Sequence, residues 1–201
     1  MSQPIPCEYI SWNRFYDLCR RLVSKVRQAG FQPDVIVAIG RGGYMPARIV
    51  SDFLGLMNLT SFKMEHYRGA HKEPIATVRY PLAADVTGQR VLLVDDVSDT
   101  GDTFRVALEH IRERSTPAEV RTAALHHKVV SHVVPDFYAR KMVKWRWIIY
   151  PWAVVEDLSA FLESMEPRPR SVEEFAERLA RDYQVRMPRR MLLDVLTATQ
   201  S

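Results

Sequence analysis

The stretch VLLVDDVSDTGDTF, residues 91–104, decides how this sequence folds and where its chemistry lies. It begins with four apolar residues, which predict a strand buried on both faces. Asp95, Asp96 and Asp99 follow among small polar residues, and an apolar helical pattern resumes over 102–114. A buried strand that leads through a polar turn into a helix is part of a βαβ unit, so the stretch predicts a parallel sheet covered by helices.

The rest of the chain repeats this alternation. Residues 12–29 predict a helix that ends at Gly30, and the segment after GRGGYMP predicts another that ends at Gly55. Residues 65–77 show no sustained period and predict a long loop. The predicted strands are 35–39, 59–64, 90–96, 119–127 and 145–150. The expected fold class is therefore α/β, with a doubly wound, mostly parallel, five-stranded sheet flanked by helices.

The composition is that of an ordinary globular protein. The 28 basic and 24 acidic residues leave a net charge of +4, which does not by itself indicate a nucleic-acid partner. Cys7 and Cys19 are the two cysteines, without a CxxC pattern, and predict reduced thiols. The N-terminus has no basic segment before an apolar run, and no stretch approaches the ~20 apolar residues of a membrane span. We expect a soluble, cytoplasmic protein that binds neither membrane nor nucleic acid.

The last part of the chain predicts a helical extension. EPRPR, residues 166–170, reads as a linker, and Ser171 with Glu174 forms a capping box before an apolar helical pattern. A shorter helix is expected over about 189–197. The predicted domains are therefore 1–165 and the extension 166–201, whose seven arginines and six acids leave a net charge near +1.

The turn after the central strand predicts a phosphate site. Ligands of parallel sheets bind beyond the carboxyl ends of the strands, where this turn lies. Backbone N–H groups and the positive end of a helix dipole converge there, Gly101 permits close approach, and Thr100 and Thr103 add hydroxyl donors. No GxxxxGK[ST] pattern is present, so this is not the loop of nucleoside triphosphate-binding proteins.

The adjacent carboxylates of Asp95 and Asp96 require another ligand, because carboxylates do not bind phosphate. They suit sugar hydroxyls or a hard cation such as Mg²⁺, and beside a phosphate cradle they indicate a phosphorylated ribose. The alternative is an N-cap aspartate with solvated neighbours.

The second glycine-rich turn, GRGG at 40–43, predicts an anion site or a plain tight turn. The third glycine of a dinucleotide fingerprint would fall on Met45, so that reading is not favoured. Arg41, flanked by glycines, offers a guanidinium to a second anionic group such as pyrophosphate.

These two motifs resemble those of the type I phosphoribosyltransferases. VLLVDDVSDTGDTF is similar to the family's signature for phosphoribosyl pyrophosphate (PRPP), and GRGGYMPAR is similar to its pyrophosphate loop. The resemblance spans about residues 10–158 and is closest to the 6-oxopurine enzymes, on Lys128 and WIIYPW at 147–152. It implies a small hood built from the N-terminal segment and 129–155, and an Mg²⁺-dependent transferase of purine salvage. It also implies PRPP and a 6-oxopurine as substrates, and a homodimer or higher homo-oligomer.

The resemblance also implies roles for residues that contact PRPP. Asp95 and Asp96 would address the ribose hydroxyls and the associated Mg²⁺. The 5′-phosphate would be bound by Asp99, Thr100, Gly101, Asp102 and Thr103, and the pyrophosphate by Arg41, Gly42 and Gly43. The helix dipole alone also accounts for Asp102.

For the purine, the resemblance implies that Asp99 is the general base at N7 and that Lys128 donates to the 6-oxo group. Trp147 would stack on the base and Ile148 would offer backbone contacts. Alternatives remain open: Lys128 as a solvated strand-end lysine, and Trp147 as a core residue. A mobile loop is expected to carry His66 and Tyr67, where related enzymes commonly carry a Ser-Tyr pair.

Two other functions remain open. One is a regulatory protein that binds PRPP without transferring it, although the nearly neutral tail and the retained Asp99 argue against it. The other is a phosphoribosyltransferase for another base, although Lys128 would face the amino group of adenine unfavourably.

Overall fold

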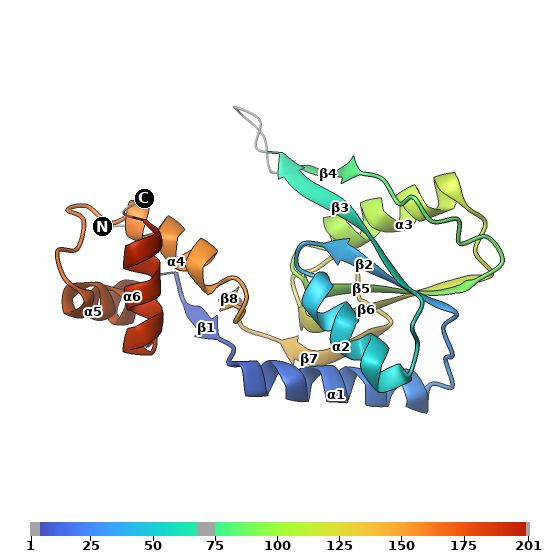
Figure 1. The fold of residues 1–201 in the computed structure, drawn as a ribbon, viewed down its shortest axis with the longest axis horizontal. Coiled ribbons are helices and arrows are strands. Elements are labelled where there is room, and N and C mark those ends of the chain that lie inside the picture. Colours follow the sequence, from blue (N-terminus) through green and yellow to red (C-terminus); the bar gives the residue numbers. More distant parts are fainter. Residues whose placement is uncertain (1–4, 68–74, 200–201) are drawn as a thin grey trace. The chain divides into compact units, whose positions relative to one another are not determined.

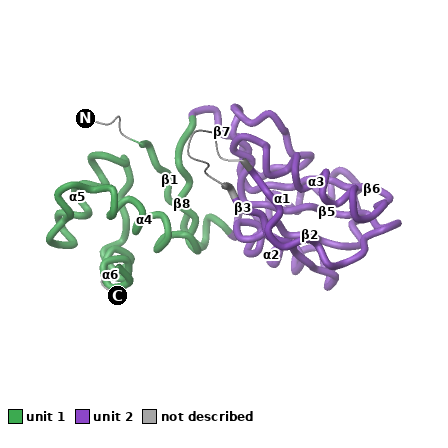
Figure 2. Tube along the Cα trace, turned by 90° about the horizontal axis from the view of Figure 1, so that it is seen from above, with its two compact units in different colours: residues 1–15, 145–201 green, residues 16–144 purple. Residues whose placement is uncertain are grey.

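The computed structural model describes residues 5–67 and 75–199. The chain forms two compact units: unit 1 consists of residues 1–15 and 145–201, and unit 2 of residues 16–144 (Figure 2). Among the described residues, no helix has both the length and the apolar character needed to cross a membrane.

A mostly parallel sheet forms the centre of unit 2 (Figure 1). In the described residues it contains six strands in the order β4-β3-β2-β5-β6-β7, and only the β3–β4 pair is antiparallel. The expected α/β, doubly wound fold class is therefore confirmed. The strands are β2 (Val35–Gly40), β3 (Leu59–Tyr67), β4 (Ile75–Tyr80), β5 (Arg90–Ser98), β6 (Glu119–Lys128) and β7 (Phe137–Met142).

Helices cover both faces of this sheet (Figure 1). Val35, Val37 and Ile39 of β2 join one core cluster with α3 (Asp102–Arg114). Successive residues of a strand point to opposite faces, so the equally buried Ile36 and Ala38 face the other side. That side is covered by α1 (Trp12–Gln28) and α2 (Tyr44–Leu54). Burial on both faces explains why the central strands are continuous apolar runs.

Unit 1 has its own hydrophobic core, to which the C-terminal extension contributes. Its strands β1 (Cys7–Tyr9) and β8 (Trp147–Ile149) pair in parallel, and its helices are α4 (Val154–Glu163), α5 (Val172–Asp182) and α6 (Arg189–Ala198). Apolar residues from β1, β8 and all three helices share one buried cluster. The extension also bonds to the N-terminal segment, since Ile5 N and Cys7 N donate to the carbonyls of Asp182 and Tyr183 at 3.1 and 2.8 Å.

The boundary predicted at residue 165 runs through this core. The compact units instead divide the chain at 15/16 and 144/145, because the apolar faces of α5 and α6 pack with α4 and Ile149. The two helices themselves lie where the sequence predicts them, and Ser171 accepts the predicted cap bond from Glu174 N at 3.1 Å.

Two predictions about strands were wrong. The segment 145–150 does not supply the fifth strand of the central sheet, because its residues 147–149 pair with β1, while β4 and β7 complete the sheet. The segment 65–77 is also not a loop throughout, because β3 runs to Tyr67 and β4 begins at Ile75. His66 and Tyr67 are therefore strand residues in register with Ala76 and Ile75, whereas 68–74 lie outside the described residues.

Candidate active site

The predicted PRPP residues of unit 2 come together at the carboxyl edge of three neighbouring strands. Ala38 of β2 lies opposite Val94 of β5, so the turn that begins at Gly40 is level with Asp96. On the other side of β5, Ser98 lies opposite His127, which brings Lys128 level with Asp99. The register of the sheet thus gathers segments 40–43, 95–103 and 128 at one edge, although they are far apart in sequence.

The glycines of the 40–43 turn are required by close packing. A Cβ on Gly42 would lie 2.6 Å from the carboxylate atoms of Asp96, and one on Gly43 would lie 2.3 Å from the carbonyl oxygen of Val94. Real Cβ atoms do not approach this closely. The peptide bond between Gly40 and Arg41 is cis. This packing places the Gly42 backbone against the carboxylate of Asp96.

Asp95 and Asp96 form a sheltered carboxylate pair. Burial, and then the charge of Asp96, raise the pKa of Asp95 well above its usual range. Burial also raises the pKa of Asp96 to about 7, against the lowering effect of backbone hydrogen bonds and of Lys128. Desolvation penalises the charged form, and a bound cation would relieve that penalty.

The pair also fits the way Mg²⁺ binds. Among the described residues, no group of three or more His, Cys, Asp or Glu side chains is arranged to hold a metal. Mg²⁺ commonly takes one or two carboxylates and completes its shell with water and substrate phosphates. Asp95 and Asp96 match that pattern rather than a metal cage made by protein alone.

Lys128 and Asp99 form a direct ion pair. Lys128 Nζ donates to Asp99 Oδ2 at 2.6 Å, and the Lys128 side chain is only 3% exposed. This burial argues against the alternative of a solvated lysine at a strand end. A buried cation beside aspartates is a strong donor for an oxygen acceptor that enters the site.

The loop between β5 and α3 has the shape of an anion cradle. Gly101 is the N-cap of α3 with a left-handed φ of 97° and, as a glycine, has no side chain to accept a cap hydrogen bond. Thr100 Oγ1 donates to Asp102 Oδ2 at 2.8 Å and accepts from Asp102 N at 3.3 Å. Asp102 is the first residue of α3 and Thr103 the second, so residues 99–103 lie around one helix N-terminus.

The remaining residues predicted to contact the purine, Trp147 and Ile148, belong to unit 1. Trp147 is 40% exposed at the start of β8, which argues against its being a core residue, whereas Ile148 is buried. The side chains of His66 and Tyr67 lie outside what the structure describes.

Sequence reasoning did not include Ser98 and Ser131 in the site. Their hydroxyl oxygens lie 2.7 Å apart in a buried position behind the 99–103 loop. No local pattern marks either serine, since the two are 33 residues apart and each follows a predicted strand.

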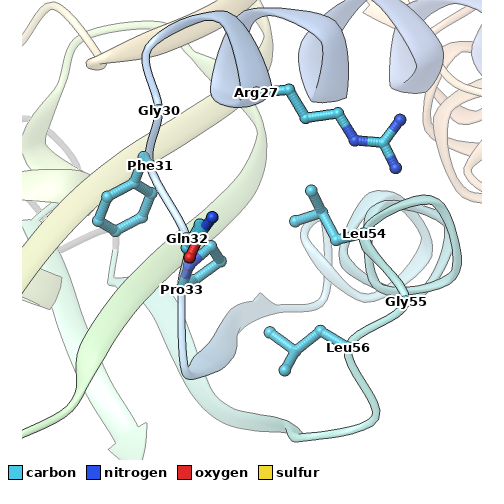
Figure 3. A pocket seen from close by; sticks show the side chains of 8 residues that line it. All are labelled: Arg27, Gly30, Phe31, Gln32, Pro33, Leu54, Gly55 and Leu56. Atoms are coloured by element: carbon cyan, nitrogen blue, oxygen red, sulfur yellow. The ribbon is translucent and has the colours of Figure 1, made fainter.

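A separate pocket of about 360 Å³ lies elsewhere in unit 2 (Figure 3). It is lined by residues near the ends of α1 and α2, among them Arg27, Phe31, Leu54 and Leu56. Pro33, at its wall, precedes β2, so the pocket lies near the amino end of that strand, away from Gly40. It does not contain the predicted site residues.

The chain is similar to known proteins over most of its length. The family model described as the phosphoribosyl transferase domain matches residues 8–157. The chain is 29% identical over 189 residues to the hypoxanthine-guanine phosphoribosyltransferase of Saccharomyces cerevisiae, covering 72% of this chain and 85% of that protein. It is 26% identical over 161 residues to the xanthine-guanine phosphoribosyltransferase of Cereibacter sphaeroides, covering 76% and 92%. Among solved structures, the purine phosphoribosyltransferase of Pyrococcus horikoshii is similar with a TM-score of 0.64 and 33% identity, covering 73% and 93%.

Proposed function

Because the chain belongs to the phosphoribosyl transferase family, whose domain matches residues 8–157, we propose that it transfers the phosphoribosyl group of PRPP to a 6-oxopurine. The acceptor atom is N9 of hypoxanthine, guanine or xanthine, and the products are the nucleoside 5′-monophosphate and pyrophosphate. The observation that carries the proposal is the buried Lys128, held by Asp99 directly beside the 99–103 cradle. One edge of the sheet thus combines a phosphate site with a donor for a carbonyl oxygen.

The PRPP residues have the chemistry that this ligand requires. Residues 99–103 surround the N-terminus of α3 and suit the 5′-phosphate, whereas Gly42, Gly43 and the Arg41 guanidinium suit the pyrophosphate. Asp95 and Asp96 suit the ribose hydroxyls. As pyrophosphate leaves, the sugar becomes oxocarbenium-like, and Arg41 stabilises the charge that accumulates on the leaving group.

Mg²⁺ is the metal that the family normally uses with PRPP. Asp95 and Asp96 would hold it together with oxygens of PRPP and water, and it would supply charge neutralisation at the pyrophosphate. The sheltered carboxylates must lose their protons to do so, which ties metal binding to pH.

The base residues explain a preference for an oxygen at purine position 6. A lysine ammonium has three donor hydrogens, so the bond from Lys128 to Asp99 is compatible with a second bond to a 6-oxo group. Asp99 accepts the purine proton at N7 as the general base. We assign Trp147 to stacking on the base and Ile148 to backbone contacts, and the exposed ring of Trp147 supports its role.

We also propose a homodimer or higher homo-oligomer that works in the cytoplasm, a compartment supported by the free thiols of Cys7 and Cys19. Burial raises the pKa of both thiols to about 12, so they are unreactive.

Replacement of the general base tests the mechanism. Asp99→Ala is expected to lower kcat by at least ~10²-fold in an assay with saturating PRPP and hypoxanthine or guanine. Asp52→Ala, which removes an exposed carboxylate paired with Arg48 on α2, serves as the control and keeps the rate of the unmodified protein. Unchanged turnover in Asp99→Ala would show that another group accepts the proton.

A further inference from the structure

The turn after β6, residues 129–133, packs behind the loop that we assign to the 5′-phosphate. His132 N donates to the carbonyl oxygen of Thr100 at 2.8 Å, and Ser131 N donates to the carbonyl oxygen of Lys128 at 2.9 Å. The hydroxyl oxygens of Ser98 and Ser131 lie 2.7 Å apart, and both residues are buried, with Ser98 1% and Ser131 9% exposed. The 129–133 turn therefore contacts the 5′-phosphate loop at two points: at Ser98, where β5 ends, and at Thr100.

The two serines form a saturated hydrogen-bond network with Val133. Ser98 Oγ and Ser131 Oγ lie 2.9 and 2.8 Å from the carbonyl oxygen of Val133, and Val133 N lies 3.3 Å from Ser131 Oγ. Each hydroxyl has one proton, so one hydroxyl donates to the other and the second donates to the carbonyl. In either arrangement both protons are used. If Ser98 is replaced, Ser131 Oγ can still donate to the Val133 carbonyl, whereas loss of Ser131 leaves that carbonyl to Ser98 Oγ and deprives Val133 N of its acceptor.

Gly101 shows how closely this turn approaches the loop. A Cβ at Gly101 would lie 2.6 Å from Val133 N and 2.9 Å from Ser131 Oγ. The left-handed φ of 97° at this residue is thus combined with direct backbone packing against the 129–133 turn. The conformation of the cradle depends on a segment that does not itself carry the anion-binding groups.

We propose that Ser131 is a positioning residue for the phosphoribosyl substrate, which shapes the 5′-phosphate loop from behind through Ser98 and the Val133 backbone. This inference rests on the proposed function. Ser131 does not touch the substrate. It lowers the free energy that the 5′-phosphate loop must spend on rearranging when the ligand binds. Its effect is confined to ligands that carry the 5′-phosphate, because the pyrophosphate turn at 40–43 has separate packing partners, Asp96 and Val94.

Calorimetric titration of the full chain with ribose 5-phosphate, and separately with inorganic pyrophosphate, both with Mg²⁺, tests the proposal. In Ser131→Ala, the Kd for ribose 5-phosphate is expected to rise roughly three- to ten-fold, while the Kd for pyrophosphate stays unchanged. With PRPP as substrate, KM rises by a similar factor and kcat is retained. Ser51→Ala is the matched control, because Ser51 is also buried and donates to the Leu56 carbonyl oxygen at 2.6 Å, in a different part of unit 2.

A second variant keeps the test decisive if Ser131→Ala is unstable. Ser98→Ala removes the other hydroxyl of the pair, and the double variant, in which neither hydroxyl remains to donate to the Val133 carbonyl, should bind ribose 5-phosphate more weakly than either single variant. Unchanged ribose 5-phosphate binding in both single variants, or equal weakening of both ligands, overturns the positioning role alone. Absence of ribose 5-phosphate binding by the unmodified protein would instead overturn the proposed function, and this inference with it.

Discussion

Phe175 of α5 tests whether the C-terminal extension stabilises unit 1. Its side chain is 0% exposed and packs in the same cluster as Cys7, Ile149 and residues of α4 and α6. Truncation of a buried phenylalanine to alanine costs about 3–5 kcal/mol, a large part of the ~5–15 kcal/mol that stabilises a typical domain. With a urea dependence of about 1.5 kcal/mol per molar, Phe175→Ala should lower the unfolding midpoint by roughly 2 M or more.

Tryptophan fluorescence during urea unfolding measures this effect selectively. All four tryptophans, at positions 12, 145, 147 and 152, belong to unit 1, so the signal follows that unit. Leu193→Ala is the matched control, because Leu193 lies on α6 with its side chain 41% exposed, and its effect should stay within about 0.5 kcal/mol. A loss below about 1 kcal/mol in Phe175→Ala would refute the role of the extension in the core of unit 1.

Two further predictions concern the candidate site. Burial raises the pKa of Asp96 to about 7, so the folded state holds the Asp96 proton more tightly than the unfolded chain does. The stability that this protonation contributes is fully present below about pH 4 and is lost as the pH rises to about 7. Asp96→Asn should therefore raise the free energy of unfolding by at least ~1 kcal/mol at pH 8 but not at pH 4 in urea titrations; an equal shift at both pH values would argue against the raised pKa. Gly101→Ala should destabilise the chain by about 1–3 kcal/mol and raise KM for PRPP, because its Cβ would meet Val133 N at 2.6 Å. Gly88→Ala is its control, since Gly88 has a φ of 72° but a Cβ there would meet nothing within 4 Å, so a similar loss in both variants would show that φ strain alone is responsible.

Local sequence signals predicted the buried strands and the helix ends well. The apolar runs at 35–39 and 91–94 and the glycines that end α1 and α2 are strong signals, because burial on both faces and left-handed φ angles restrict residue choice. The same signal misplaced WRWIIY, since an apolar run shows that a strand is buried but not which strand pairs with it. β7, FYARKM, was missed because an edge strand has half-buried polar residues that weaken the alternation.

The contacts within the candidate site depend on register, which no local pattern reveals. Lys128 and Asp99 are separated by 29 residues and meet because β6 lies beside β5 with His127 opposite Ser98. Ser131 lies behind the 99–103 loop, in a turn with no distinctive sequence. Residue types indicated which chemistry to expect, whereas the pairing of β5 with β6 determines which side chains meet.

Turnover of each base by the unmodified protein is the most direct measurement of the proposed function. With Mg²⁺ and PRPP, an absorbance assay should show conversion of at least one of hypoxanthine, guanine and xanthine to its 5′-monophosphate, with one pyrophosphate released per nucleotide. Adenine should not react, because the buried Lys128 would face its amino group. Binding of PRPP without turnover of any 6-oxopurine, or turnover of adenine instead, would contradict the assignment.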